Sequence, residues 1–362
     1  MAEKKVVVGL SGGVDSSVAF LLLKKQGFSP LGLTLDLPVW EDSKSLMREN
    51  ICCTAEGIRW VKKLCLQLKV PYYVLNCHEE FKRIVVDYFV KEYQKGRTPN
   101  PCMICNKYLR FPKFFEFAKK AKADFIATGH YAKSAKCKTQ NAKLVYQLLQ
   151  GKDKKKDQSY FLALLSQKEL SQLIFPLGDY TKKEVYQIAK KEGFKMPVQR
   201  PESQDFCFVT GKSKNFFLEE KIGPKPGPIL DKKGRVLGRH QGLHFYTIGQ
   251  RKGLELSGGP FYVLKLDTVQ NAVIVTRAKP HLYQKKVVFE SWNFISSESP
   301  KIPLTVMAKT RYRQPLAKAT LFPPKEKTLE LVFDQPQFAI TPGQFTVFYK
   351  GEVCLGGGAI AS

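Results

Sequence analysis

The sequence predicts an α/β domain with a parallel, doubly wound sheet, followed by a small β-rich middle domain and a C-terminal β-barrel. Strand and helix patterns alternate through the first half, which is typical of βαβ units. Glycine, proline and short alternating runs replace them after about residue 211, and the pattern is wholly β from Lys285 onward. We therefore expect domains at residues 1–211, 212–283 and 284–362.

The elements of the first domain follow from apolar periodicity and from turn residues, such as Gly27 at the end of the first helix. The expected strands are Lys5–Leu10, Leu31–Leu35, Pro71–Asn76 and Phe125–Thr128, and the expected helices are Asp15–Gln26, Ala55–Leu68, Glu79–Tyr93, Tyr108–Ala121, Gln158–Leu165 and Lys182–Glu192. Ligands of parallel sheets bind at the carboxyl ends of the strands, so we expect Ser11–Ser16 and Thr128–Tyr131 on one rim.

Short apolar runs predict the strands of the other two domains. They are Gly227–Leu237, His244–Ile248, Phe261–Leu266 and Ala272–Thr276 in the middle domain, and Leu304–Lys309, Ala317–Leu321, Leu329–Phe333, Gln344–Tyr349 and Val353–Ile360 in the barrel. The barrel also carries the basic residues Lys309, Arg311, Arg313, Lys318, Lys325 and Lys327. On a strand, Arg311 and Arg313 would share one face and Tyr312 the other. Arginine binds phosphate and tyrosine stacks on bases, so this pattern favours RNA.

The composition is that of a globular protein with a strong excess of basic residues. Hydrophobic residues make up 43% of the 362 residues, and 59 Lys and Arg against 32 Asp and Glu leave a net charge of +27. Such a charge is typical of a lysine-rich solvated surface or of binding to RNA, DNA or an acidic membrane. No apolar run approaches the roughly 20 residues of a membrane span, and the first apolar run is too short for a signal peptide. We expect a cytoplasmic protein with no membrane partner.

Nine cysteines, an odd number, suit a reducing compartment, where closely spaced cysteines are metal-binding or catalytic. Cys102 and Cys105 form a C-x-x-C after a proline-braced segment, just before a helix expected to start near Lys107. That helix start and neighbouring basic residues favour thiolates. A third candidate is Cys207. Cys65, Cys77, Cys137 and Cys354 are expected to be ordinary buried cysteines, while Cys52 and Cys53 stay undecided.

A glycine-rich loop follows the first strand, with the sequence GLSGGVDSS from Gly9 to Ser17. Gly12 and Gly13 allow backbone N–H groups to point inward, the serines add hydroxyl donors, and the start of the following helix favours an anion. The loop is neither a Walker loop, since no Gly-Lys-Ser/Thr follows, nor a dinucleotide G-x-G-x-x-G. We interpret it as a phosphate-binding loop.

The loop resembles the PP-loop of the ATP pyrophosphatases, which are adenine nucleotide alpha hydrolase-like α/β proteins. This resemblance implies that ATP and Mg²⁺ bind here. The implied ATP-binding residues are Gly9, Leu10, Ser11, Gly12, Gly13, Val14, Asp15, Ser16, Leu35 and Gly129. Asp15 would help to place the metal ion.

Ordered motifs along nearly the whole chain extend the resemblance. They are GLSGGVDSSVA, GRTPNPC-x-x-CN, ATGHYAK, KDQSYFL, DFCF, GQRKGL, TRYRQ, TPGQ and GEVCLGGG. Each is weak alone, but their ordered combination is similar to the bacterial tRNA-specific 2-thiouridylases. In that family, ATP adenylates O2 of the wobble uridine and a cysteine persulfide delivers sulfur to C2. The resemblance implies Cys105 as nucleophile, Cys207 as persulfide carrier, and a Cys105–Cys207 disulfide after turnover.

The same resemblance implies the partners of the protein. They are the anticodon stem-loop of tRNA and a sulfur-donor protein, either a cysteine desulfurase or a sulfur relay protein. The segment facing the target base would be Asn100, Pro101 and Cys102, and further tRNA contacts would come from His130, Lys156, Asp157, Gln158, Arg311, Tyr312 and Gln344.

One residue departs from the family pattern. Cys102 stands where a branch of the family has Asp, a candidate acid or base. Cys102, Cys105 and Cys207 could instead hold a 4Fe–4S cluster, for which thiolates are suited. The persulfide route is preferred. Two other functions compete: an ATP pyrophosphatase that acts on a small molecule, which would need neither the cysteines nor the basic excess, and a non-catalytic RNA-binding protein, which would not need an intact loop.

Overall fold

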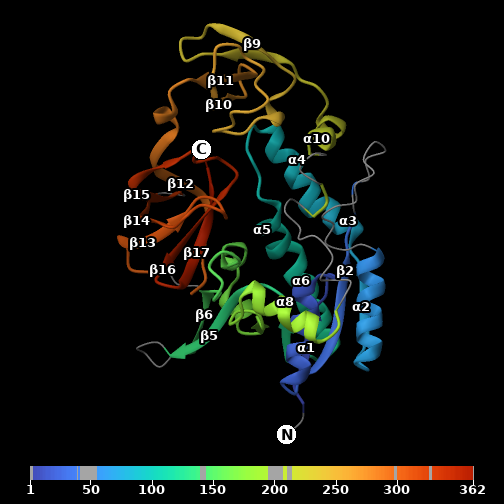
Figure 1. The fold of residues 1–362 in the computed structure, drawn as a ribbon. Coiled ribbons are helices and arrows are strands. Elements are labelled where there is room, and N and C mark those ends of the chain that lie inside the picture. Colours follow the sequence, from blue (N-terminus) through green and yellow to red (C-terminus); the bar gives the residue numbers. More distant parts are fainter. Residues whose placement is uncertain are drawn as a thin grey trace.

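The protein folds into three parts, and Figure 1 shows them in sequence colours. The computed structural model describes residues 3–38, 40, 55–138, 144–194, 207–209, 214–296, 300–325 and 328–361. The helical N-terminal part and the red and orange C-terminal strands lie side by side, and the yellow middle part lies at one end of both. No helix in the described part of the chain is long and apolar enough to cross a membrane.

The N-terminal part contains a sheet of five parallel strands in the order β3-β2-β1-β4-β7. These strands are β1 (Lys5–Gly9), β2 (Ser29–Asp36), β3 (Tyr72–Asn76), β4 (Phe125–Ala127) and β7 (Leu173–Ile174). The strand order reverses between β1 and β4, so the loops after these two strands diverge and leave a crevice at their carboxyl ends. The predicted parallel sheet is therefore confirmed, and the loop from Gly9 starts at the reversal point.

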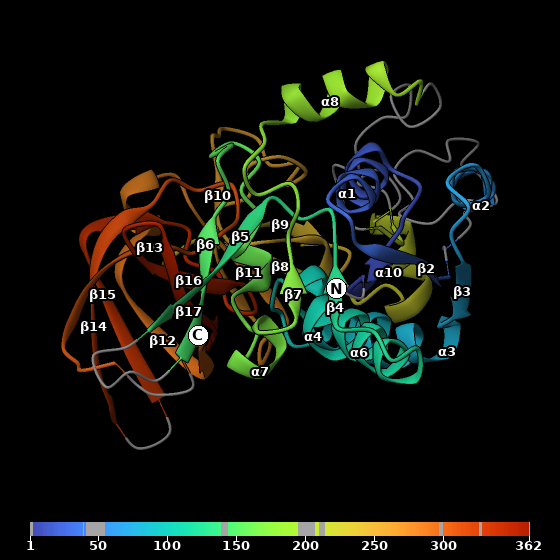
Figure 2. The same cartoon turned by 90° about the horizontal axis from the view of Figure 1, so that it is seen from below.

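Helices cover both faces of this sheet. They are α1 (Val14–Lys25), α2 (Ala55–Gln67), α3 (His78–Phe81), α4 (Asp87–Gln94), α5 (Pro101–Cys105), α6 (Phe111–Lys120), α7 (Gln167–Leu170), α8 (Lys182–Lys191) and α10 (Lys214–Ile222). Val6 and Val8 of β1 pack into a core with α1, α2 and α8, whereas Val7 packs into a second core with α3, α4 and α6. This alternation along a strand is typical of a doubly wound sheet. Figure 2 shows α1 and α8 on one side of β4 and α4 and α6 on the other.

Two helix predictions were wrong in their bounds. The helix expected from Tyr108 starts at Pro101, because α5 runs through a π-helical segment, Asn106–Arg110, directly into α6. Asn at the N-cap and Pro at the first helical position are a helix-start signal, and here it outweighs the tendency of prolines toward extended backbone. The expected helix Gln158–Leu165 is only a 3₁₀ turn, Ser159–Leu162.

The middle part is a four-stranded sheet in the order β10-β11-β8-β9. Its strands are β8 (Gly227–Leu230), β9 (Val236–His240), β10 (Tyr262–Asp267) and β11 (Ala272–Thr276). The strand expected at His244–Ile248 was wrong, because the chain forms a 3₁₀ turn at Leu243–Phe245.

The predicted C-terminal β-barrel is confirmed, and the structure closes it with six strands. They are β12 (Tyr283–Phe294), β13 (Leu304–Lys309), β14 (Ala317–Lys325), β15 (Thr328–Phe338), β16 (Phe345–Lys350) and β17 (Val353–Ile360). The ring closes because β12 pairs with both β15 and β17. A hairpin of the N-terminal part, β5 (Ala132–Lys138) and β6 (Leu144–Gln150), adds to this sheet along β17. The sequence analysis did not predict this hairpin, which ties the barrel to the first domain.

Candidate active site

The loop after β1 is a compact turn held by its own serines. Gly12 has a φ of +78°, a conformation that favours glycine. The Ser11 backbone N–H donates to Ser16 Oγ at 3.2 Å, and the hydroxyls of Ser16 and Ser17 donate to the Gly13 carbonyl at 3.1 and 3.0 Å. Gly13 is the N-cap of α1. The first backbone N–H groups of α1 therefore start at this turn, as an anion site requires.

Close packing explains two glycines of the site. A Cβ at Gly12 would lie 2.5 Å from the Gly57 Cα of α2, and a Cβ at Gly129 would lie 2.8 Å from the Ser16 N. The loops after β1 and β4 are thus in contact, which confirms the single rim expected from the sequence. Leu10, Val14 and Leu35 are buried around the turn, at 3%, 5% and 6% exposure.

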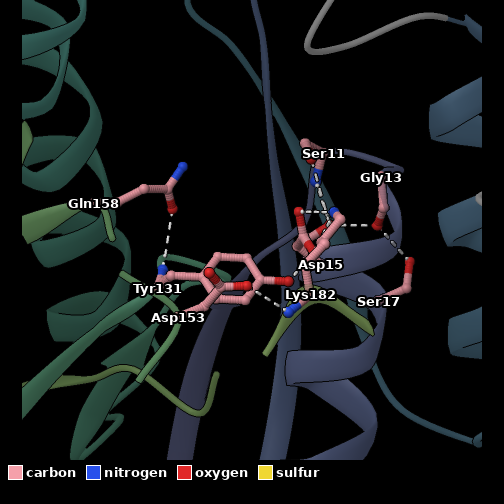
Figure 3. A network of polar contacts seen from close by, with 9 residues as sticks. Ser11, Gly13, Asp15, Ser17, Tyr131, Asp153, Gln158 and Lys182 are labelled. Carbon is pink, nitrogen blue, oxygen red and sulfur yellow. Dashed lines mark hydrogen bonds and ion pairs between the residues drawn. The ribbon is translucent and has the colours of Figure 1, made fainter. Parts of the chain in front are cut away.

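A lysine that the sequence analysis did not select reaches into this loop. Lys182 Nζ lies 2.8 Å from both carboxylate oxygens of Asp15, and the Tyr131 hydroxyl donates to Asp15 Oδ1 at 2.7 Å (Figure 3). Tyr131 follows β4, and Lys182 is the first residue of α8, whose start is held by Thr181 and Glu184 in a capping box. The T-x-x-E pattern marks this helix start in the sequence. This pattern does not predict that Lys182 pairs with Asp15, which lies 167 residues away in the sequence.

The two cysteines of the C-x-x-C lie on α5 rather than before it. The Asn100 side chain caps the helix by accepting from the Met103 N–H at 3.3 Å. Cys102 is half-buried and Cys105 is buried at 5% exposure. Both therefore belong to the first turns of a helix, where the partial positive charge of the N-terminus favours a thiolate.

Cys207 lies in a short described stretch, residues 207–209. Its neighbour Phe208 is buried, with its ring 5.5 Å from the Phe81 ring and 5.3 Å from the Phe89 ring. Cys207 packs against the same cluster of buried residues that contains Cys105. Cys105 and Cys207 therefore both contact the large core of the first domain.

The cysteine set does not fit a metal cluster. Within the described ranges, which include Cys102, Cys105 and Cys207, no three His, Cys, Asp or Glu side chains form a group that could hold a metal ion. We therefore derive no step through a 4Fe–4S cluster.

Cys65, Cys77 and Cys354 are buried as expected, whereas the prediction that Cys137 is buried was wrong. Burial raises the pKa of Cys65 to about 12 and that of Cys77 to about 11, and raises the pKa of Cys354 as well. Such thiols are inert. Cys137 is half-buried on β5 and contacts the Val145 carbonyl at 3.6 Å. Cys52 and Cys53 lie outside the described residues, as does Lys327.

His130 lies beside the loop after β4 as a neutral group. Its Nδ1 is 2.7 Å from Thr128 Oγ1, and its ring packs near those of Phe111 and Phe175. Burial, helped by the charge of Arg110, lowers the pKa of His130 to about 3. This histidine can donate or accept a hydrogen bond to a base at neutral pH but does not add positive charge.

The KDQ segment, Lys156–Gln158, contains one buried residue between two half-buried ones. Asp157 is 3% exposed, and its carboxylate accepts from the N–H groups of Gly151 and Ser159 and from the Ser159 hydroxyl. It orders this loop from inside. Gln158 Oε1 accepts from the Tyr131 N–H at 3.0 Å, which links the segment to the phosphate loop through Tyr131. Lys156 is half-buried in the same turn.

The TRYRQ segment was predicted as a strand, and this was wrong. Residues 310–314 form the turn between β13 and β14, so Arg311 and Arg313 do not share a strand face. The alternating pattern resembles a strand, but Thr310 and Gln314 close the turn with a side-chain hydrogen bond. Arg313 is exposed, whereas Arg311 is directed inward.

Three residues lie where the barrel packs against the first domain, namely Arg311, Tyr312 and Gln344. Arg311 Nη2 donates to the Ala339 carbonyl at 3.2 Å, and the Tyr312 ring lies 4.5 Å from the Phe161 ring. Gln344 Nε2 donates to the carbonyls of Thr98 and Pro99 at 2.9 and 3.1 Å. Gln344 therefore contacts the segment that leads to Asn100, whereas Tyr312 contacts the 3₁₀ turn that contains Phe161.

The fold and its loop define a nucleotide-binding α/β domain that carries two β domains. Family models described as tRNA methyl transferase HUP domain, tRNA methyl transferase PRC-barrel domain and Aminomethyltransferase beta-barrel domain match residues 4–211, 214–277 and 284–360. Proteins named tRNA-specific 2-thiouridylase MnmA from Roseiflexus castenholzii and Clostridium perfringens are 43% and 42% identical over 371 and 366 residues. Those alignments cover 99% and 100% of this chain and 99% of each relative. The chain belongs to the tRNA-specific 2-thiouridylase family.

A solved structure of a 4-thiouridine synthetase in complex with RNA and bound ATP is also similar, with a TM-score of 0.37 and 16% identity. The similarity covers 60% of this chain and 50% of that one.

Proposed function

We infer that this protein is an ATP-dependent sulfurtransferase that makes 2-thiouridine in tRNA. The observation that carries this inference is the full-length identity of about two fifths to relatives named tRNA-specific 2-thiouridylase. The loop after β1 would supply the phosphate site, and Cys105 and Cys207 would supply the thiols that such a reaction needs. Because its substrates are tRNA and ATP, we place the protein in the cytoplasm.

ATP would bind with its phosphates at the turn from Ser11 to Ser16, where the N-terminus of α1 begins. Lys182 is the cation nearest to this turn in the network of Figure 3, so it is a further candidate for phosphate contact. Asp15 would help to hold Mg²⁺, which prefers oxygen ligands. Its side chain is 33% exposed, and a carboxylate has about four lone-pair sites, so Lys182 and Tyr131 leave capacity for a metal ion.

The sulfur chemistry proceeds in three balanced steps. Attack of uridine O2 on the α-phosphate of ATP releases pyrophosphate and makes the oxygen a leaving group. The terminal sulfur of a Cys207 persulfide attacks C2, and AMP leaves. The Cys105 thiolate then attacks Cys207 Sγ, which forms the Cys105–Cys207 disulfide and releases 2-thiouridine. A sulfur-donor protein, such as a cysteine desulfurase or a relay protein, and a dithiol reductant would restore the persulfide for the next turnover.

The wobble uridine of the anticodon stem-loop would face Asn100, Pro101 and Cys102. To reach them it must leave its stack, as in other enzymes that act on bases. Further contacts with the tRNA would come from Arg311, Tyr312 and Gln344 of the barrel and from His130, Lys156 and Gln158 of the first domain. Asp157 would act indirectly, since it is buried and orders the loop.

The test combines unmodified tRNA, ATP, Mg²⁺ and a sulfur donor with the purified protein. We expect 2-thiouridine in the RNA and one AMP per thiolation. AMP formed without RNA but with a small molecule would instead support the competing small-molecule function. RNA binding without any AMP would support a non-catalytic protein and overturn the proposal.

A further inference from the structure

Lys309 is a buried cation at the seam between the barrel and the first domain. It is 8% exposed and lies at the end of β13. Val306 and Ala308 of the same strand belong to the barrel core, whereas Met307 packs against the core of the first domain. Side chains alternate along a strand, so Lys309 points out of the barrel and toward the first domain.

Three tyrosine rings surround the ammonium group of Lys309. Its Nζ lies 5.5 Å from the ring centres of Tyr160 and Tyr312 and 5.9 Å from that of Tyr349. Within the described ranges of the chain, Lys309 has neither a hydrogen-bond acceptor nor an ion pair. Aromatic faces attract a cation but do not accept its three N–H groups strongly, so the ammonium retains unused donors.

A second cation, the half-buried Arg311, adjoins this cage. Arg311 donates to backbone carbonyls and to Thr341, and its Nε is buried with no partner in the described part of the chain. Both cations interact with Tyr160. The charge of Arg311 interacts with the Tyr160 hydroxyl, and the ammonium group of Lys309 faces the Tyr160 ring.

Positive charge exceeds negative charge around Lys309 and Arg311. The carboxylate that acts on Lys309 is Asp157, which already accepts three hydrogen bonds from Gly151 and Ser159. Buried charges in proteins are normally paired, because an isolated one is costly. One buried cation and one half-buried cation beside one occupied carboxylate therefore indicate an anionic ligand that is absent from the protein itself.

We propose that Lys309, with Arg311 beside it, forms an anion site for a phosphodiester group of the RNA substrate, next to the nucleotide that is modified. The position of this site follows from Tyr160. The Tyr160 ring faces Lys309, and the Tyr160 hydroxyl interacts with the side chain of Asn100, the N-cap of α5. A phosphate supplies the negative oxygens that both cations lack. The proposal rests on the proposed function, since it takes RNA as the substrate.

The site predicts opposite effects on stability and on binding. Replacing Lys309 by methionine removes a costly buried charge but keeps most of the volume of the side chain. Lys309→Met should therefore melt at the same or a higher temperature than the wild type. Its affinity for unmodified tRNA should fall roughly 10- to 100-fold, the range of a charge-assisted hydrogen bond. The slope of log K against log salt should become shallower by about one unit.

Matched controls separate this site from general electrostatics. Lys318→Met removes an exposed lysine on the neighbouring strand β14, 3.4 Å from Asp334, and should change tRNA affinity less than about threefold. Lys309→Arg should recover part of the binding. ATP affinity should be unchanged in all variants, which excludes the triphosphate as the anion. A tRNA with single neutral methylphosphonate linkages around the wobble nucleotide should locate the contact, because one linkage should weaken binding by the wild type but not further weaken binding by Lys309→Met.

The outcomes are distinct. If the wild type binds tRNA with a steep salt dependence and Lys309→Met keeps both affinity and slope, the anion site is wrong and the proposed function stands. A lower melting temperature with unchanged RNA affinity would make Lys309 a structural element of the tyrosine cage, which also overturns the site. If the wild type binds no tRNA, the proposed function itself fails.

Discussion

Two lysines of this protein differ in whether the fold supplies a carboxylate to balance their charge. Lys182 at the phosphate loop is paired with Asp15 through both carboxylate oxygens, whereas Lys309 at the barrel seam has three aromatic rings and no ion pair among the described residues. A ligand at the first site competes with an existing ion pair. A ligand at the second site supplies a charge that the fold lacks. The Lys182–Asp15 pair stabilises the protein without ligand. Lys309 forms an ion pair only when an anion binds, so its electrostatic energy contributes to binding.

Variants of the three candidate cysteines should give the largest effects. Cys105→Ser and Cys207→Ser should lose thiolation by more than about 1,000-fold, because a hydroxyl replaces the nucleophile or the sulfur carrier. Cys102→Ser should be slower but active. Thiouridine per AMP, measured by mass spectrometry, checks this, while ATP and tRNA affinities should stay near those of the wild type.

An equal loss in all three cysteine variants, together with iron and labile sulfide in anaerobically purified protein, would contradict the persulfide route. It would leave the thiolation reaction and both binding regions unaffected.

The Asp15 carboxylate at the phosphate loop should be needed for AMP formation. Asp15→Ala should reduce it by roughly 100-fold or more, because it removes the carboxylate expected to place Mg²⁺ and leaves Lys182 unpaired. Affinity for tRNA should not change, since the barrel seam is intact. Full thiolation by this variant would show that the loop is not the ATP site.

The comparison of the two lysines also predicts opposite shifts in melting temperature. Lys182→Met leaves the Asp15 carboxylate without its cation, so this variant should melt below the wild type. Lys309→Met should not. Differential scanning calorimetry without ligands measures both under one condition, and a parallel decrease in the two variants would contradict the distinction.

Much of the phosphate site could be predicted because its signals are local. The apolar strand, the paired glycines and the start of α1 stand within a dozen residues of one another. Lys182 and the hairpin β5–β6 were not predicted, because their partners are distant in sequence and the local pattern does not specify them. The helix start at Pro101 was missed for another reason: proline suits both extended backbone and a first helical turn, and only the cap by Asn100 decides between them.

Arg311 is expected to have a smaller, roughly tenfold effect on RNA binding. Arg311→Ala removes one cation of the seam, so tRNA affinity and its salt slope should fall while ATP affinity is retained. Arg313→Ala is the matched control, since Arg313 is exposed on the same turn. Equal effects of the two variants, measured by filter binding from roughly 50 to 200 mM salt, would assign the contribution to general surface charge.

The smallest expected effect comes from His130, which adds no charge to either region. Burial lowers its pKa to about 3, so the folded protein keeps it neutral, whereas the unfolded chain takes up a proton near the ordinary value of roughly 6.5. The unfolded state therefore binds more protons between these values, and this part of the stability is complete above roughly pH 6.5 and decreases as the pH falls toward 3. At pH 6 the loss is about 1 kcal/mol. His130→Asn should remove this dependence relative to the wild type, as measured by urea unfolding at pH 7.5 and pH 6. If both proteins lose the same stability, His130 is protonated in the folded protein and contributes positive charge to the rim after all.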